Sequence, residues 1–348
     1  MPYIIAEYIW LDSNKKFRSK TKIIKHVIDY NNYYTNESLN LPVFPEWDYD
    51  GSSTGQAEGK KSEIILRPVY VCDNPLMNTI NSNVMYSKLV LCETYYPDGT
   101  TTLSNTRKFC KEKHDLCHKQ NPWFGLEQEY FILDKHVGSS KNVDNTTEHY
   151  CGIGIEIKYR KIAEEHMMAC MKSNIIISGI NAEVSKDQWE FQVGPSEGVK
   201  AADDLLIARF LLERIAEKYD LTISYDPKPF KDINGSGCHT NFSTLKMRTP
   251  CKDNAGLDEI YRVINNLEKN HSEDIKYYGT NNEDRLSGKH ETSSYEKFSY
   301  GVGDRGCSVR INNNTHKSGY GYFEDRRPAA NMDPYLVTGI LMSRLEDD

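Results

Sequence analysis

The sequence lacks a long hydrophobic run, and it has little excess charge of either sign. No stretch approaches the roughly 20 consecutive apolar residues that a membrane-spanning helix needs, and 50 acidic against 43 basic residues give a net charge of −7. An acidic balance disfavours nucleic acids and anionic membranes as partners. Residues 1–17 show neither a basic leader before an apolar run nor the pattern of a transit peptide. We therefore expect a cytoplasmic protein that binds neither nucleic acid nor membrane.

Paired cysteines and the common nucleotide-binding motifs are also missing. The nine cysteines are scattered and form no Cys-x-x-Cys, which excludes the usual zinc clusters and makes a disulfide framework unexpected. Neither the GxxxxGK[ST] loop nor the protein-kinase motif set occurs. If the chain binds ATP, its site has a less common architecture.

Hydrophobic periodicity predicts strands and helices in separate blocks rather than in strict alternation, which favours an α+β fold. The third expected helix would carry Asp203 and Asp204 in its first turn. A turn signal at 96–99 suggests two domains, 1–99 and 100–348. Residues 134–148 are typical of a polar loop. The expected strands are 3–11, 62–71, 89–96, 126–133, 180–185, 188–194, 222–226 and 238–244, and the expected helices are 104–119, 160–173, 201–219 and 257–276.

The most informative local pattern is a pair of glutamates inside an apolar stretch. Glu127 and Glu129 lie in PWFGLEQEY (122–130), so in a strand both side chains point to one face. Carboxylates placed together repel each other and are costly to desolvate. An isolated pair of this kind usually lies on a solvated strand face. Here the aromatic flanks and the carboxylates downstream favour a divalent metal site.

Two further acidic residues occur among apolar or aromatic neighbours. Glu183 lies in NAEV (181–184), and Glu190 lies in QWEFQ (188–192), where it would share a strand face with Gln192. On its own, this pattern fits an edge-strand pair equally well, because charged residues are usually exposed.

A third motif, GSGCHTNFS (235–243), alternates His239, Asn241 and Ser243 onto one strand face. Imidazole is a common metal ligand, and Asn and Ser side chains can hydrogen-bond a nucleotide. The preceding glycines allow a ligand to approach the backbone closely. A lone histidine of this kind is more often a core residue.

Arginines gather in the last quarter of the chain, among turn residues and near Glu291 and Glu324. Guanidinium groups bind carboxylates and phosphates with a fork of donors. Together with five or more carboxylates and one histidine, they indicate two or three divalent ions and a phosphate-bearing substrate. The arginines are Arg285, Arg305, Arg310, Arg326 and Arg327.

Taken in order, these motifs resemble those of the glutamine synthetases of the eukaryotic type. The resemblance spans nearly the whole chain, and its motifs are highly specific in combination. The matching stretches are PEWDYDGSSTGQAEG (45–59), WFGLEQEY (123–130), NAEV with QWEFQVGP (181–195), YDPKP (225–229), NGSGCHTNFST (234–244), RLSGKHET (285–292), DRGCSVRI (304–311) and GYFEDRRPAANMDPY (321–335).

The resemblance implies a fold, an assembly and a reaction. The fold would be an N-terminal β-grasp domain followed by a larger catalytic domain of the glutamine synthetase/guanido kinase-like class, with an antiparallel sheet funnel. Subunits would form a homo-oligomer, a decamer of two pentameric rings, with the DGSS loop of one subunit covering the funnel of its neighbour. The reaction would join ammonia to the γ-carboxylate of L-glutamate through γ-glutamyl phosphate, with ATP as substrate and Mg²⁺ or Mn²⁺ as cofactor.

The resemblance also implies a role for each matched residue. Glu129, Glu183 and Glu190 would hold a metal on the ammonium side, and Glu127, His239 and Glu324 one on the phosphate side. Arg285, Arg305 and Arg326 would grip glutamate or the transferring phosphoryl group, while Asn234 and Gly235 would contact the amino-acid head. Arg310, Asn241, Ser243 and Tyr322 would bind the nucleotide. Asp50, Ser53, Tyr150 and Glu183 would form the ammonium site, and Glu291 would close over the intermediate.

Departures from the family pattern leave these positions intact. Residues 134–148 lack the usual Gly-Trp-Pro, and Asn312 and Asn313 replace a Pro-Arg. Two rival readings stay open: a γ-glutamyl ligase for a different amine, and a relative without catalysis. The retained Asp50, Tyr150 and Glu183 favour ammonia, and the retained metal positions favour an enzyme.

Overall fold

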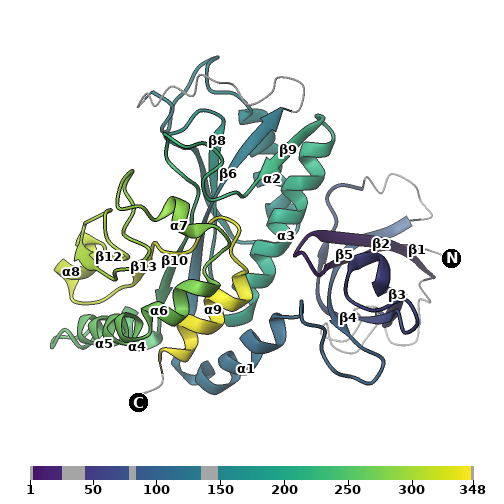
Figure 1. Cartoon of the computed structure of the whole chain (residues 1–348), viewed down its shortest axis with the longest axis horizontal. Coiled ribbons are helices and arrows are strands. Elements are labelled where there is room, and N and C mark those ends of the chain that lie inside the picture. Colours follow the sequence, from purple (N-terminus) through teal and green to yellow (C-terminus); the bar gives the residue numbers. More distant parts are fainter. Residues whose placement is uncertain (1–2, 26–43, 78–83, 135–147, 346–348) are drawn as a thin grey trace, which may run out of the picture. The chain divides into compact units, whose positions relative to one another are not determined.

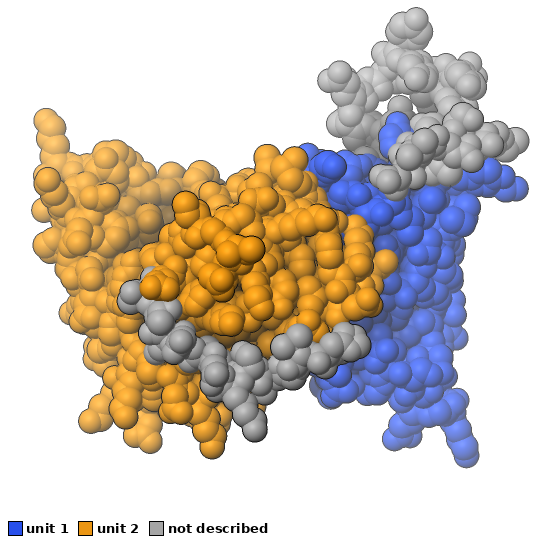
Figure 2. All heavy atoms as spheres, turned by 90° about the horizontal axis from the view of Figure 1, so that it is seen from above, with its two compact units in different colours: residues 1–106, 172–174 blue, residues 107–171, 175–348 orange. Residues whose placement is uncertain are grey.

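The structure is a computed structural model that describes residues 3–25, 44–77, 84–134 and 148–345. The chain divides into two compact units, coloured separately in Figure 2: residues 1–106 with 172–174, and residues 107–171 with 175–348. Most of the polar loop expected at 134–148 lies outside the described residues. Both units combine sheets with helices or helical turns, in agreement with the α+β class.

The first unit contains a sheet of strand order β2-β1-β5-β4-β3, in which β1 and β5 are parallel and the other neighbours antiparallel. The strands expected at 3–11, 62–71 and 89–96 are confirmed as β1, β4 and β5, whereas β2 and β3 were not expected. The bounds are β1 (Tyr3–Leu11), β2 (Phe17–Lys25), β3 (Trp47–Asp50), β4 (Glu63–Asp73) and β5 (Val84–Tyr95), and a 3₁₀ turn, η2 (Gly51–Thr54), follows β3.

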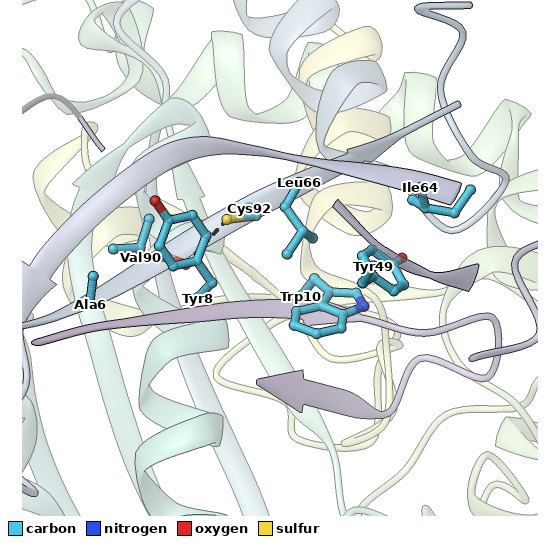
Figure 3. Packing of buried hydrophobic residues seen from close by; sticks show 8 residues of the cluster. All are labelled: Ala6, Tyr8, Trp10, Tyr49, Ile64, Leu66, Val90 and Cys92. Atoms are coloured by element: carbon cyan, nitrogen blue, oxygen red, sulfur yellow. Dashed lines mark hydrogen bonds between the residues drawn. The ribbon is translucent and has the colours of Figure 1, made fainter. Parts of the chain in front are cut away.

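One face of this sheet forms a hydrophobic core (Figure 3). Alternate residues of β1, namely Ala6, Tyr8 and Trp10, point to the same side because side chains alternate along a strand. There Trp10 packs against Tyr49 of β3, with 4.6 Å between the ring centroids. This packing fixes β3, and therefore the start of the polar loop that follows it.

The second unit is built on a sheet of order β11-β12-β13-β10-β6-β8-β7, with β9 paired to β6. Its strands are antiparallel apart from the β11–β12 pair. All five strands expected between 126 and 244 are confirmed, and β11 to β13 were not expected. The bounds are β6 (Trp123–Asp134), β7 (Ile177–Ala182), β8 (Gln188–Glu197), β9 (Leu221–Ser224), β10 (Cys238–Ser243), β11 (Tyr300–Val302), β12 (Val309–Ile311) and β13 (Phe323–Asp325).

The second unit also contains helices and short helical turns. The four expected helices are confirmed in position, although the last is broken after Lys269 into separate pieces. The bounds are α1 (Arg107–Cys117), η3 (His118–Gln120), α2 (Arg160–Lys172), α3 (Gly198–Glu217), α4 (Leu245–Arg248), α5 (Ala255–Lys269), α6 (His271–Asp274), η4 (Ile275–Tyr277), α7 (Asn282–Arg285), α8 (Asn313–Ser318) and α9 (Pro334–Ser343). Among the described residues, no helix is long and apolar enough to cross a membrane.

The placement of Asp203 and Asp204 in a first turn was wrong, because α3 begins earlier, at Gly198. Both side chains are buried and serve in ion pairs rather than at the helix end. Asp203 accepts two hydrogen bonds from Arg107, at 2.8 and 2.9 Å, and Asp204 pairs with Lys200. Their charge therefore ties α1 to α3 and supports the helix locally.

Helix α3 lies against β6, β8 and β9, which it follows lengthwise in Figure 1. The strand β6 has the matching pattern, since Phe124, Leu126 and Tyr130 are fully buried. Because side chains alternate, Glu127 and Glu129 point to the opposite face of the sheet. The helix layer thus leaves one sheet face free for polar side chains.

Candidate active site

The register of the sheet places the acidic side chains opposite one another. Glu129 of β6 pairs across the ladder with Glu190 of β8, and Glu127 pairs with His239 of β10. Glu324 of β13 pairs with Asn241 of β10 on one side. Like charges directly opposite each other destabilise a sheet, so this arrangement is costly for folding and indicates a site.

Three carboxylates form the group that we call the first triad: Glu129, Glu183 and Glu190. One oxygen from each lies within 4.8 Å of the others. Burial raises the pKa of all three carboxyl groups. For Glu129 and Glu190, repulsion from the neighbouring carboxylates is the second cause. The folded chain thus resists placing three negative charges here.

The polar partners of the first triad are neutral amides. Asn181 donates to Glu183 Oε1 at 2.9 Å, and Gln192 donates both to Glu190 and to Asn181 Oδ1. Glu129 Oε2 accepts the Gly237 N–H at 2.8 Å. These groups orient the carboxylates but supply no positive charge.

A second group, which we call the second triad, consists of Glu127, His239 and Glu324. One ligand atom of each again lies within 4.8 Å of the others. His239 Nδ1 is 3.6 Å from Glu127 Oε2 and 3.4 Å from Glu324 Oε1. Burial, with a smaller contribution from Arg326, lowers the pKa of His239 well below its ordinary value. The imidazole is therefore neutral and able to act as a ligand.

Guanidinium groups surround the second triad. Two guanidinium groups donate to the Glu324 carboxylate: Arg310 through Nε at 2.5 Å and Arg326 through Nη1 at 2.7 Å. The Glu324 side chain is only 2% exposed. Arg285 Nη2 lies 3.0 Å from His239 Nε2. Because a guanidinium can only donate, His239 Nε2 accepts and its ring proton is on Nδ1, toward the carboxylates.

Arg285 and His239 contact each other beside Gly237, which has no side chain. A Cβ added at Gly237 would lie 2.4 Å from Arg285 Nη2 and 2.9 Å from His239 Nε2. Arg285 also donates to the backbone carbonyls of Arg326 and Arg327. Burial lowers the pKa of Arg285 to about 10, so it keeps its charge near neutral pH.

The first triad, together with Glu127 and His239 of the second, lines one cavity of about 650 Å³. Most of the residues predicted from the sequence also line it: Tyr150, Asn234, Gly235, Arg285, Glu291, Arg305, Arg310 and Arg326. The sheet supplies the acidic floor, and the segments after β11 and α7 supply Arg305 and Glu291.

The remaining predicted residues lie elsewhere. Asn241 contacts the second triad, because its side-chain amide donates a hydrogen bond to Glu127 Oε1 at 2.7 Å. Ser243 is buried at the end of β10 beside Arg248, and Tyr322 is exposed before β13. Asp50 and Ser53 belong to the first unit.

Arg327 does not join the arginine group expected from the sequence. It follows Arg326 directly, but its side chain is fully buried on the other side, where it pairs with Asp325 at 2.7 Å. His271 and Tyr278 complete its surroundings. The residue therefore has a structural role.

Several cavity residues were missed as site residues from the sequence: Asn181, Val184, Gln188, Gln192, His290 and Thr292. Asn181 and Gln188 lie in the motifs NAEV and QWEFQ, each two positions before a glutamate. A signal existed for Gln188 and Gln192, because both share the strand face of Glu190. His290 and Thr292 flank Glu291, but no strand or helix was expected there, so no alternation of side chains indicated them.

The donor set of each triad fits a hard divalent cation. Carboxylate oxygens with one imidazole suit Mg²⁺ or Mn²⁺ better than soft metals, which prefer thiolates. The three carboxylates of the first triad, two of them buried and Glu183 partly so, have raised pKa values and gain the most from such a charge.

Comparison with known proteins agrees with this donor set. A family model described as glutamine synthetase, catalytic domain, matches residues 105–346. The chain belongs to the glutamine synthetase family. A putative glutamine synthetase of Acanthamoeba polyphaga mimivirus is 46% identical over 343 residues, which cover 97% of this chain and 93% of that relative.

Cellular relatives show similar values. The glutamine synthetase of Yarrowia lipolytica is 44% identical over 345 residues, or 97% of this chain and 89% of the relative. A chloroplastic glutamine synthetase of Brassica napus is 43% identical over 351 residues, or 97% of this chain and 77% of the relative. The similarity thus extends well beyond the residues of the catalytic family model.

Proposed function

We propose that this member of the glutamine synthetase family joins ammonia to the γ-carboxylate of L-glutamate, with ATP converted to ADP and phosphate. The observation that carries the proposal is a cavity lined by the first triad, by Glu127 and His239 of the second triad, and by four arginines. A carboxylate reacts poorly with ammonia because oxide is a poor leaving group. Transfer of the γ-phosphoryl group first gives γ-glutamyl phosphate, from which phosphate can leave.

Two or three Mg²⁺ or Mn²⁺ ions would complete the site. The first triad would hold one on the ammonium side and the second triad one on the phosphate side, where the ion supplies charge neutralisation for the transferring phosphoryl group. His239 would offer Nδ1, which faces the two carboxylates of its triad, once the bound cation displaces the proton on that nitrogen.

The arginines and the neighbouring backbone would bind the substrates. Arg305 and Arg326 would stabilise the negative charge that spreads over the phosphoryl oxygens, and Arg285 would contact glutamate. Asn234 and Gly235 would hold the amino-acid head. Gly235 has no room for a side chain, because a Cβ would lie 2.2 Å from the Pro227 carbonyl oxygen. Arg310, Asn241, Ser243 and Tyr322 would bind the nucleotide.

Ammonium would be bound by Tyr150 and Glu183, with Asp50 and Ser53 from a neighbouring subunit. The Asp50 carboxylate accepts hydrogen bonds from Ser52 and Ser53 at 2.7 and 2.8 Å, and these lower its pKa to about 2. Asp50 is therefore negatively charged at every physiological pH and able to attract a cation. Removal of a proton from bound ammonium is required before nitrogen can attack.

Glu291 would close over the acyl phosphate and keep water out. Both Glu291 and its neighbour His290 have positive φ angles, 58° and 54°. This conformation is strained for residues with a side chain and is common at functional segments. The Glu291 carbonyl accepts a hydrogen bond from Arg326 at 3.3 Å, which links the segment to the cavity.

The finer features of fold and assembly belong to the same proposal. Residues 1–99 would form a β-grasp domain, and residues 100–348 a catalytic domain that carries the sheet funnel. The chain would form a cytoplasmic homo-oligomer, a decamer of two pentameric rings. The long match to relatives of this family supports these assignments.

An assay with ATP, glutamate and different amines tests the reaction. We expect ADP release to depend on glutamate, on Mg²⁺ or Mn²⁺, and on ammonium, and we expect methylamine and larger amines to be much poorer substrates. His239→Ala should abolish phosphoryl transfer with a retained cooperative melt. Preference for a larger amine would favour the rival ligase, and no ADP release under any condition would reject the proposal.

Mixed oligomers test whether the active site is shared between subunits. Asp50→Ala and Glu324→Ala subunits, each inactive alone, should regain part of the activity after subunit exchange, because one mixed interface contains an intact site. Exchange verified by mass spectrometry without any recovery would place each complete site within a single chain.

A further inference from the structure

Gln188 is a buried amide on the floor of the cavity. It is the first residue of β8, its side chain shares the strand face of Glu190, and it is only 2% exposed. It lines the same cavity as the first triad, Glu127 and His239. Nothing in the proposed reaction uses it so far.

The amide nitrogen of Gln188 lies among three acceptors. It is 3.0 Å from the Gly235 carbonyl oxygen, 2.9 Å from Ser236 Oγ and 3.4 Å from Glu129 Oε2. These acceptors fix the orientation of the amide group. If the group were flipped, its oxygen would face the Gly235 carbonyl and the Glu129 carboxylate, neither of which can donate a hydrogen bond. Its oxygen, Oε1, is buried without a hydrogen-bond partner among the described residues.

A buried amide oxygen without a partner is unfavourable. Core packing alone would be served as well by an apolar side chain of the same length, without that cost. The retained amide therefore indicates that the three contacts of its nitrogen are useful to the protein.

The contacts of Gln188 connect two parts of the site. On one side is Glu129 of the first triad, whose Oε2 also accepts the Gly237 N–H. On the other side are Gly235 and Ser236, and Ser236 is held in place by hydrogen bonds to the backbone of Pro227 and Ala330. Gln188 thus joins Glu129 to the segment that would hold the head of glutamate.

We propose that Gln188 is a positioning residue that couples cation binding at the first triad to glutamate binding at residues 234–236. A cation at the first triad would fix Glu129, and Glu129 would fix the amide and, through it, the Gly235 carbonyl. Glutamate would therefore bind more tightly with the cation present, and the cation more tightly with glutamate present, since coupling is reciprocal. This inference rests on the proposed function of the site.

Isothermal titration calorimetry on the full-length chain, with Mn²⁺ and L-glutamate as probes, measures this coupling directly. In the parent protein, we expect saturating Mn²⁺ to tighten glutamate binding by about tenfold, a typical coupling. In Gln188→Met, which keeps the length and loses the donor, this factor should fall to near one. Glutamate binding in saturating Mn²⁺ should weaken by about tenfold, and KM for glutamate should rise more than kcat falls.

The matched control is Gln128→Met. Gln128 is another fully buried glutamine on the same sheet, but its side chain points away from the cavity, where it accepts from Arg209 and donates to the backbone carbonyls of Glu129 and Ala330 rather than to the Glu129 carboxylate. This variant should lose stability and keep the coupling factor. If Gln188→Met does not melt cooperatively, Gln188→Asn replaces it, since the shorter amide cannot reach both Glu129 and Ser236.

The outcomes separate the inference from the proposed function. A parent protein that binds neither Mn²⁺ nor glutamate would reject the proposed function. A parent protein that binds both without coupling, or a Gln188→Met variant that keeps the parent coupling factor, would overturn the role of Gln188 and leave the function standing.

Discussion

The first triad and the second triad lie close together in one site, yet their carboxylates have different hydrogen-bond partners. The carboxylates of the first triad are contacted by the amides of Asn181, Gln188 and Gln192. The second triad has Arg310 and Arg326 bound directly to Glu324. Amides orient a carboxylate without changing the charge, whereas guanidinium groups cancel part of it.

The different partners of the two triads give them different effects on folding stability and on cation binding. In the first triad, the charges of Arg285 and Arg326 offset the repulsion at Glu129 only in part, because burial and Glu183 still raise its pKa. The rest would be relieved by a cation from solution, so folding stability and cation binding oppose each other. In the second triad, Glu324 is already paired, and the arginines also face the cavity where phosphate would lie. The second triad is thus stable by itself, and the first triad depends on its ligand.

The largest effect is expected when the pairing of the second triad is removed. Glu324→Ala leaves Arg310 and Arg326 without their carboxylate in a largely buried place, so the unfolding free energy should fall by about 3 kcal/mol. Urea denaturation of the metal-free protein measures it. Glu190→Ala is the matched control in the first triad and should cost far less. Equal losses in the two variants would contradict the contrast between the triads.

Glu190→Gln should change the pH dependence of stability. In the folded, metal-free chain, the raised pKa of Glu190 keeps its proton on at pH values where the unfolded chain has released it. The native state then binds more protons, so stability falls as the pH rises above the ordinary carboxyl range, by at most about 1.4 kcal/mol per pH unit for each proton.

The variant should be more stable than the parent at about pH 8, and its stability should fall less between about pH 5 and pH 8. Thermal or urea unfolding with a chelator present measures both quantities. A parent chain whose metal-free stability rises over this interval would show that Glu190 is not held in its protonated form.

Cation binding should occur in two steps, and the first triad should bind first. It offers three carboxylates against two in the second triad, and affinity for hard cations rises with the number of charged ligands. We expect dissociation constants about tenfold apart in a calorimetric Mn²⁺ titration. Glu190→Gln should remove the tighter step and Glu127→Gln the weaker one. Loss of the same step in both variants would show that the triads do not bind separately.

The smallest effect is expected at Asn241. Its side chain donates to Glu127 at 2.7 Å and is partly exposed, so Asn241→Ala should weaken the second cation step or raise KM for ATP by a few fold, the value of one hydrogen bond of about 1 kcal/mol. Steady-state kinetics at varied ATP and Mn²⁺ separates the two. A change confined to KM for ATP would favour direct nucleotide contact over the contact with Glu127.

The sequence by itself determined the local geometry of the site. Alternation along a strand is a property of the backbone, so the shared face of Glu127 and Glu129 follows from their spacing alone. The same rule predicted the face of His239 and Asn241. The motifs that indicate the family also lie in order along the chain, and recognising them requires no structure.

Elements without a clear period were not predicted. Helix α9 is apolar almost all round and β2 is largely exposed, so neither shows the contrast on which periodicity depends. The start of α3 at Gly198 was missed because no capping side chain precedes it. A weak signal for α9 existed in Asp333 and Pro334, since Asp caps the helix and Pro occupies its first turn.

Only the tertiary structure decided which distant residues meet. The pairing of Glu129 with Glu190, and of Glu127 with His239, depends on strand register, which is set by packing of the opposite face against α3 and not by local sequence. The same holds for Arg326 and Arg327, adjacent in sequence. One lies in the cavity and the other in the core, because Arg326 follows β13 on the side of Glu324, whereas Arg327 lies on the side of the buried Asp325.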